Sequence, residues 1–126
     1  MDSPSNTVLV VDDDAAIRFL CRVNLELDGW TVREASSVTE ARTAVAEGDI
    51  AVVLLDVHLG VENSLDFLAE LHAEHPGLPV AMLTGSVGTP RLEGVTVDAV
   101  IPKPFKPDEL AATVRTLAMR LAPNAG

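Results

Sequence analysis

The sequence predicts a single α/β domain with a doubly wound, parallel five-stranded sheet. Short runs of apolar and β-branched residues alternate five times with segments of helical periodicity. Parallel strands need long crossover connections, which helices supply. The 126 residues are 48% hydrophobic and 22% charged, as expected for one globular domain with a substantial core.

The first strand and helix are predicted from Thr7–Val11 and the residues after it. The strand stops at three consecutive aspartates, and Asp14 can cap the helix because its side chain can accept a bond from a free backbone N–H. Gly29 is the expected C-terminal cap. The apolar residues expected on the inner face of this helix are Ile17, Leu20, Cys21 and Leu25.

The next two strands differ in character. Residues 30–35 alternate between apolar and polar, as in a half-exposed edge strand. Ser37 and Glu40 have the spacing of a capping box and begin a second helix. Residues 50–55 are almost wholly apolar and lead to Asp56, which predicts a buried parallel strand that ends in an acid at the edge of the sheet.

A third helix is predicted to begin at Ser64, after a loop that Gly60 should make freer. Pro76 and the glycine after it stop this helix. Its expected inner face consists of Leu65, Leu68, Ala69 and His72.

The last strands are predicted at residues 79–83 and 97–101, and the last helix at residues 108–121. These two strands end at Thr84 and just before Lys103. Several helix breakers lie between them, so a fourth helix should be short or irregular. These breakers are Gly85, Gly88, Pro90 and Gly94.

Five such units favour the flavodoxin-like strand order 2-1-3-4-5, because crossover connections are right-handed. Residues 7–121 should form the domain, with flexible termini at 1–6 and 122–126. Sites in these folds lie beyond the carboxyl ends of the strands, where the strand order reverses. Asp12 and Asp13 should therefore face Asp56.

Three acids in one crevice need compensation. Two carboxylates about 5 Å apart repel by roughly 3 kcal/mol at an effective dielectric constant of about 20. Oxygen ligands with open water positions suit Mg²⁺. Lys103 adds a positive charge and Thr84 a hydroxyl, so the predicted chemistry is transfer of a phosphoryl group onto Asp56.

Charge and composition exclude several classes of partner. The net charge of −10 opposes direct contact with nucleic acid or anionic lipid. No apolar stretch approaches the length of a membrane span, and residues 1–7 lack the features of a signal peptide, which predicts a cytoplasmic protein. The single cysteine, Cys21, excludes an intrachain disulfide.

Four segments resemble the motifs of response-regulator receiver domains of two-component signalling, over nearly the whole chain. These segments are Val10-Val11-Asp12-Asp13, Leu54-Leu55-Asp56, Leu83-Thr84-Gly85 and Lys103-Pro104-Phe105. The resemblance implies that Asp56 accepts a phosphoryl group from a histidine kinase or a phosphotransfer protein. It implies a phosphoacceptor rather than a turnover enzyme, and it allows a homodimer.

The resemblance also implies roles for the other site residues. Asp13, Asp56 and the backbone carbonyl of His58 would ligate Mg²⁺ directly, with Asp12 acting through water. Thr84 would be the switch hydroxyl and Lys103 would pair with the phosphoryl group. A cis peptide bond is implied between Lys103 and Pro104.

The sequence departs from the family pattern at the switch. Val100 stands where the family usually has an aromatic residue, three positions before the lysine. A valine cannot make the same inward and outward change of position, so the aromatic relay should be replaced by another route.

Two other functions stay open at this point. One is a pseudo-receiver, a binding module with the fold but without phosphorylation. The other is a Mg²⁺-dependent phosphatase with an aspartyl-phosphate intermediate. Such enzymes usually have a second acid two residues after the nucleophile, where this chain has His58.

Overall fold

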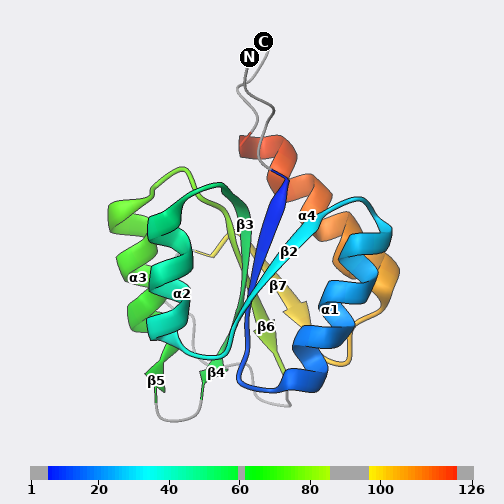
Figure 1. The fold of residues 1–126 in the computed structure, drawn as a ribbon, viewed down its shortest axis with the longest axis horizontal. Helices are drawn as coiled ribbons and strands as arrows, with labels where there is room; N and C mark the ends of the chain where they lie inside the picture. Colours follow the sequence, from blue (N-terminus) through cyan, green and yellow to red (C-terminus); the bar gives the residue numbers. More distant parts are fainter. Residues whose placement is uncertain (1–5, 60–61, 86–96, 122–126) are drawn as a thin grey trace.

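A five-stranded parallel sheet lies at the centre of the protein (Figure 1). The computed structural model describes residues 6–59, 62–85 and 97–121. The strand order is β2-β1-β3-β6-β7, which is the predicted order 2-1-3-4-5. The strands are Thr7–Val11 (β1), Thr31–Ala35 (β2), Ile50–Asp56 (β3), Val80–Thr84 (β6) and Ala99–Pro102 (β7).

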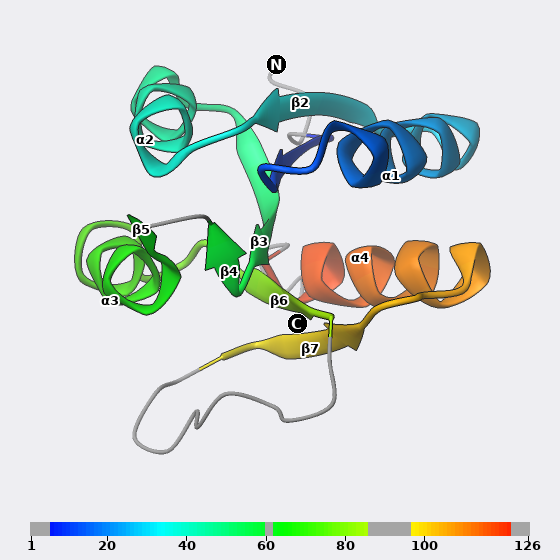
Figure 2. The same cartoon turned by 90° about the horizontal axis from the view of Figure 1, so that it is seen from below.

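Helices cover both faces of the sheet. Figure 2 shows α1 and α4 on one face and α2 and α3 on the other. Their bounds are Ala15–Leu27 (α1), Val38–Glu47 (α2), Ser64–Glu74 (α3) and Pro107–Leu121 (α4). The predicted short or irregular helix between Thr84 and Lys103 falls largely on residues 86–96, outside the described residues.

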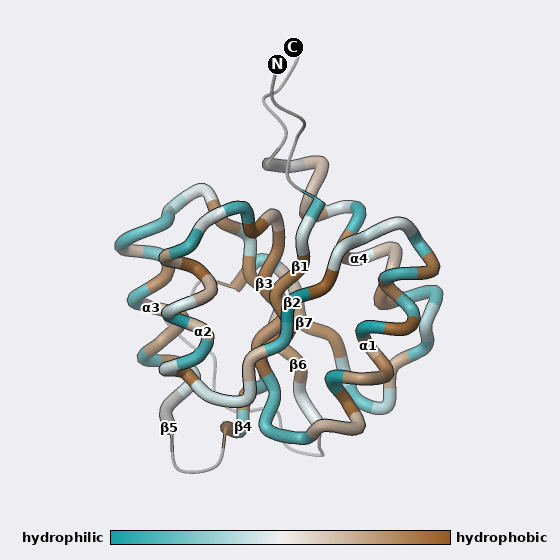
Figure 3. The backbone as a smooth tube through the Cα atoms, in the orientation of Figure 1, coloured by the Kyte–Doolittle hydropathy of each residue, from teal (hydrophilic) through white to brown (hydrophobic). Residues whose placement is uncertain are grey.

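The core consists of two apolar layers, one on each side of the sheet. Along β1, Val8 and Val10 pack on the side of α1 and α4, whereas Leu9 and Val11 pack on the side of α2 and α3. This alternation follows from the two-residue period of a strand. The central strands are therefore apolar along almost their whole length, whereas hydrophilic and hydrophobic residues alternate along the helices (Figure 3).

Side-chain caps begin the first two helices as predicted. The Asp14 Oδ1 atom accepts a hydrogen bond from Ala16 N at 2.9 Å. The Ser37 Oγ atom accepts one from Glu40 N at 3.1 Å. Each cap satisfies an N–H group that has no partner within its own helix.

Two helix faces differ from the prediction. Leu20, expected to be inside, is 42% exposed on α1. Ala69 is exposed on α3, where Phe67 and Leu71 are buried instead. Ser64 is itself buried, and residues three, four and seven positions later lie on the same side of a helix, so they turn inward with it.

The segment after Asp56 contains a short antiparallel pairing that the sequence did not predict. His58–Leu59 (β4) pairs antiparallel with Glu62–Asn63 (β5). The Leu59 side chain is 3% exposed and belongs to the core. The sequence predicted only a loop here, so the pairing of β4 with β5 was missed. The added loop freedom expected from Gly60 stays a prediction, because Gly60 lies outside the described part of the chain.

Asn6 extends the pairing of β1 with β2, because its carbonyl accepts a hydrogen bond from Thr31 N at 2.9 Å. The flexibility expected of the two termini stays a prediction. Among the described residues, no helix is both long and apolar enough to cross a bilayer.

Replacing the buried Phe67 by alanine should lower the free energy of unfolding by about 3–5 kcal/mol, because it leaves a cavity in the core. Phe67 is 1% exposed, and the Arg42 guanidinium carbon lies 6.0 Å from its ring centre. The matched control is Phe19→Ala, since Phe19 is 65% exposed. That change should cost less than about 0.5 kcal/mol in denaturant unfolding, and equal losses would contradict the core described above.

Candidate functional site

The candidate site lies at the carboxyl edge of the sheet, where β3 delivers Asp56. This strand pairs with β1 on one side and β6 on the other, and it is buried from Ala51 onward. Asp56 is 4% exposed. Its Oδ1 atom accepts a hydrogen bond from His58 N at 3.2 Å, which fixes the carboxylate against the start of the next segment.

Asp12 and Asp13 follow the end of β1. Asp12 is fully buried, whereas Asp13 is exposed. Asp12 Oδ1 accepts a hydrogen bond from Asp14 N at 2.9 Å. Its backbone carbonyl accepts another from Arg18 Nη1 at 2.7 Å, and Arg18 in turn pairs with Glu34 of β2 at 3.0 Å. The first acidic turn is thereby held by both α1 and the edge strand.

Lys103 reaches the acids from the end of β7. Its Nζ atom lies 2.9 Å from Asp12 Oδ2 and 3.3 Å from Asp56 Oδ1. Its backbone N–H donates to the Thr84 carbonyl at 2.6 Å, which ties the lysine to the end of β6. The peptide bond from Lys103 to Pro104 is cis, as the resemblance implied.

The site holds three carboxylates, two of which pair with the Lys103 ammonium group. Burial raises the pKa of Asp56 above its ordinary value, and the charge of Asp12 raises it further, although the His58 N–H and Lys103 oppose both effects. Burial opposes the charging of Lys103, but its hydrogen bond to Asp12 and the charges of both acids leave its pKa above the usual value. One lysine therefore compensates only part of the negative charge.

The acids are arranged as a candidate metal site. One carboxylate oxygen from each of Asp12, Asp13 and Asp56 lies within 4.8 Å of the other two. These donors are all hard oxygen atoms, and Asp13 lies on the exposed side where water can complete a coordination shell. The residues present therefore fit a divalent cation such as Mg²⁺.

The other predicted site residues differ in exposure and in the strand that carries them. These residues are Thr84, His58 and Val100. Thr84 is 6% exposed at the end of β6, the strand next to β3. The His58 side chain is exposed, while its backbone belongs to β4. Val100 is 44% exposed on β7, beside Met82 of β6.

Two residues at the site were not predicted from the sequence to act there. No role was predicted for Arg18, and Ser64 was predicted only as the start of a helix. The Ser64 Oγ atom donates to the Asp56 carbonyl at 2.6 Å. No sequence pattern announces either contact, because each depends on how a helix packs against the strand before it.

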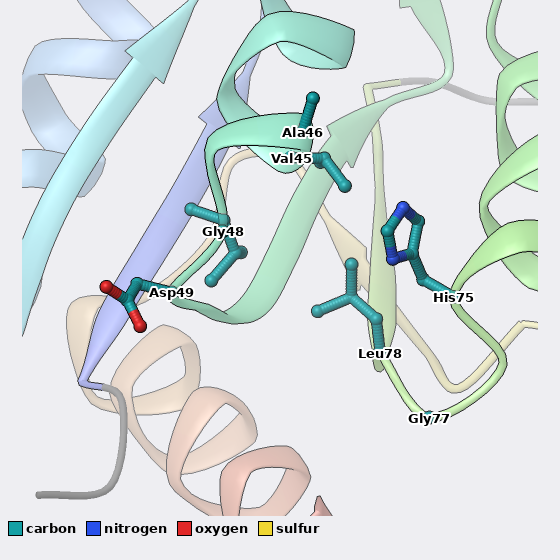
Figure 4. Close-up of a pocket in the computed structure, with 8 residues that line it drawn as sticks. Val45, Ala46, Gly48, Asp49, His75, Gly77 and Leu78 are labelled. Atoms are coloured by element: carbon teal, nitrogen blue, oxygen red, sulfur yellow. The ribbon is translucent and has the colours of Figure 1, made fainter. Parts of the chain in front are cut away.

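A separate hollow of about 450 Å³ lies at the opposite edge of the sheet. The side chains of Val45, Leu78 and His75 border it, and Asp49 lies at its margin (Figure 4). This hollow adjoins the amino ends of β3 and β6, so it is distant from Asp56. Its lining is mainly apolar and brings no cluster of acids together.

Residues 8–115 match the family of the response regulator receiver domain. The chain belongs to this family. The receiver domain is 35% identical over 122 residues to the probable transcriptional regulatory protein TcrX of Mycobacterium tuberculosis, covering 94% of this chain and 52% of that protein. It is 36% identical over 119 residues to the transcriptional regulatory protein SrrA of Staphylococcus aureus, covering 92% and 49%. The chain thus spans about half the length of these relatives.

Solved structures share the fold. A CheY-like receiver domain protein from Methanospirillum hungatei JF-1 superimposes with a TM-score of 0.84 at 25% identity, covering 92% of this chain and 95% of that one. NtrX from Brucella abortus in complex with ADP also gives 0.84 at 30% identity, covering 91% of this chain and 26% of NtrX. The α/β flavodoxin-like fold predicted from the sequence is confirmed.

Removing the charge of Asp56 should stabilise the receiver domain in the absence of divalent cations. Asp56→Asn leaves Lys103 paired with Asp12 and relieves the desolvation and repulsion that raise the pKa of Asp56. A raised pKa means that stability falls as pH rises through the folded-state value. The gain from Asp56→Asn should therefore be smallest near pH 4 and larger at pH 7 in chelator.

Asp108→Asn is the control for this measurement. Asp108 is an exposed acid in the first turn of α4, where a negative charge suits the helix dipole. Its replacement should lower the unfolding free energy by a few tenths of a kcal/mol. Urea unfolding of wild type and both variants at several pH values makes the comparison. A loss of stability in Asp56→Asn at pH 7 would show that Lys103 already compensates the site fully.

Proposed function

We propose that Asp56 accepts a phosphoryl group from the phosphohistidine of a histidine kinase or a phosphotransfer protein. The observation that carries the proposal is the partly compensated acid cluster, in which Asp56 lies beside Asp12 and within 3.3 Å of the Lys103 ammonium. An anion held in this way can attack phosphorus only where cations receive the incoming phosphoryl oxygens. The cluster supplies that environment at the accessible edge of the sheet.

In the proposed reaction an oxygen of Asp56 attacks the phosphorus in line with the leaving group. A phosphorus–oxygen bond forms, the phosphorus–nitrogen bond breaks, and its electron pair returns to the imidazole of the donor. Lys103 can then exchange its bond with Asp56 for one with a phosphoryl oxygen. The Thr84 hydroxyl is the proposed second donor to the phosphoryl group.

The proposed ligands of Mg²⁺ are the carboxylates of Asp13 and Asp56 and the backbone carbonyl of His58, with Asp12 acting through water. When bound, the ion neutralises negative charge on the phosphoryl oxygens and the carboxylates. The chain itself holds Asp56 in place through the His58 N–H, and it holds Asp12 through Arg18.

The proposed switch involves Thr84 and the surface around β6 and β7. A backbone hydrogen bond links Lys103 to Thr84, so a shift in the backbone of one residue moves the other. Val100 is exposed on β7, two residues before the partner of Thr84 in the strand register. We place the transmitted change in the backbone of β6 and β7, because valine has no ring to exchange between an inner and an outer position.

The proposed role is that of a signalling phosphoacceptor without turnover of an external substrate. The receiver domain would contact the donor protein and a protein target. A second copy of the same chain, which would form a homodimer, is one candidate target. Its charge of −10 argues against nucleic acid or membrane as a direct partner of this domain. Cytoplasmic localisation accords with this role.

Treatment with acetyl phosphate and Mg²⁺ should add the mass of one phosphoryl group to the intact protein. Asp56→Asn should abolish the adduct, because an amide is not a competent nucleophile here. Asp14→Asn should retain it, since Asp14 is an exposed helix cap and asparagine caps equally well. Chelation of Mg²⁺ should suppress the adduct in wild type.

Each alternative outcome identifies a rival. An adduct that persists in Asp56→Asn refutes Asp56 as the acceptor. Wild type that stays unmodified with acetyl phosphate, and also unchanged in its spectra with a beryllofluoride mimic, is a pseudo-receiver. Steady release of phosphate from a phosphoester in excess over protein indicates a phosphatase instead.

A further inference from the structure

Ser64 begins α3 and is buried against the backbone of the proposed phosphoacceptor. The residue is 2% exposed, and its hydroxyl donates a hydrogen bond to the Asp56 backbone carbonyl at 2.6 Å. A buried hydroxyl is costly unless it has a hydrogen-bond partner within the protein. That partner belongs to the residue on which the proposed reaction takes place.

The Asp56 carbonyl lies at the point where the sheet loses one of its pairings. The register between β1 and β3 ends at Val11 and Leu55, one residue before Asp56. On the other side Val57 N still donates to the Leu83 carbonyl at 3.0 Å. A buried carbonyl needs a donor. The Ser64 hydroxyl donates to the Asp56 carbonyl where the β1–β3 pairing has ended.

The same contact closes a ring of interactions around the site. The Asp56 carboxylate accepts from His58 N at 3.2 Å, and His58 pairs with Asn63 across the β4–β5 ribbon. Asn63 is followed at once by Ser64, whose hydroxyl returns to Asp56. The peptide groups between Asp56 and His58 are thus fixed at both ends, which orients the Asp56 carboxylate and the His58 carbonyl together.

We propose that Ser64 is a positioning residue for the phosphoacceptor site, an inference that rests on the proposed function. Its hydroxyl holds the Asp56–His58 backbone in the orientation that presents two oxygen ligands to a divalent cation. Groups that orient the ligands of a metal change its affinity on the order of 10-fold to 100-fold when they are removed. Ser64 acts through Asp56 and His58 and touches neither the cation nor the phosphoryl group.

The test compares Ser64→Ala with Ser37→Ala. Both serines stand at the start of a helix and make one side-chain hydrogen bond, but Ser37 bonds within α2, away from the acids. Both variants should lose a similar amount of thermal stability, roughly 3–5 °C. Only Ser64→Ala should raise the dissociation constant for Mg²⁺ by about 10-fold, measured as the dependence of the melting temperature on Mg²⁺ concentration.

A second readout separates positioning from folding. At saturating Mg²⁺ the rate of the acetyl phosphate reaction should stay several-fold lower in Ser64→Ala than in Ser37→Ala. Ser64→Thr keeps a hydroxyl and should recover most of the Mg²⁺ affinity. If Ser64→Ala does not fold, Ser64→Cys replaces it, because a thiol has a similar size but is a weak donor.

Equal Mg²⁺ affinities and equal rates for Ser64→Ala and wild type would overturn the proposal. Equal losses in Ser37→Ala would overturn it as well, because they would indicate general loosening. Failure of wild type to bind Mg²⁺ or to react refutes the proposed function itself. Activity in wild type without any difference between the two alanine variants refutes only the role of Ser64.

Discussion

The burial of two carboxylates beside a single ammonium group is the constraint on which the site depends. Asp12 and Asp56 are brought together because β1 and β3 are neighbours in a parallel sheet, where Asp12 directly follows β1 and Asp56 ends β3. Lys103 can reach them only because β7 ends at the same edge and its backbone bonds to Thr84. The fold thus creates a local excess of negative charge, and the remaining features of the site orient or compensate it.

The support for this cluster comes from the helices that follow each strand. Arg18 of α1 holds the Asp12 carbonyl, and Ser64 of α3 holds the Asp56 carbonyl. The two apolar layers of the sheet keep the strand ends in register beneath these contacts. The charged cluster lowers stability. It persists because the apolar core and the hydrogen bonds from Arg18 and Ser64 together fix its geometry.

The strand ends and the strand order were predictable, because apolar runs that stop at Asp12, Asp56 and Thr84 report directly where strands leave the core. The placement of the acids beside one another follows from that topology. The inner face of α3 was predicted only in part: Leu68 is buried as expected, but the buried Phe67 and Leu71 were missed. Their burial depends on Ser64, which turns inward to a backbone carbonyl. The ribbon after Asp56 was also missed, because its pairing joins residues on both sides of Gly60 and leaves no periodic pattern.

The pKa of Asp56 itself is the most direct test of the central claim, that the site holds more negative charge than Lys103 compensates. Carbon-detected NMR of the labelled carboxyl group can follow its titration with and without Mg²⁺. Without a divalent cation Asp56 should titrate above the ordinary aspartate value of 3.8. Saturating Mg²⁺ should lower that pKa, because bound cations favour the carboxylate. An Asp56 that titrates at or below the ordinary value in chelator, and does not respond to Mg²⁺, would show that Lys103 already compensates the acids and that no cation binds beside them.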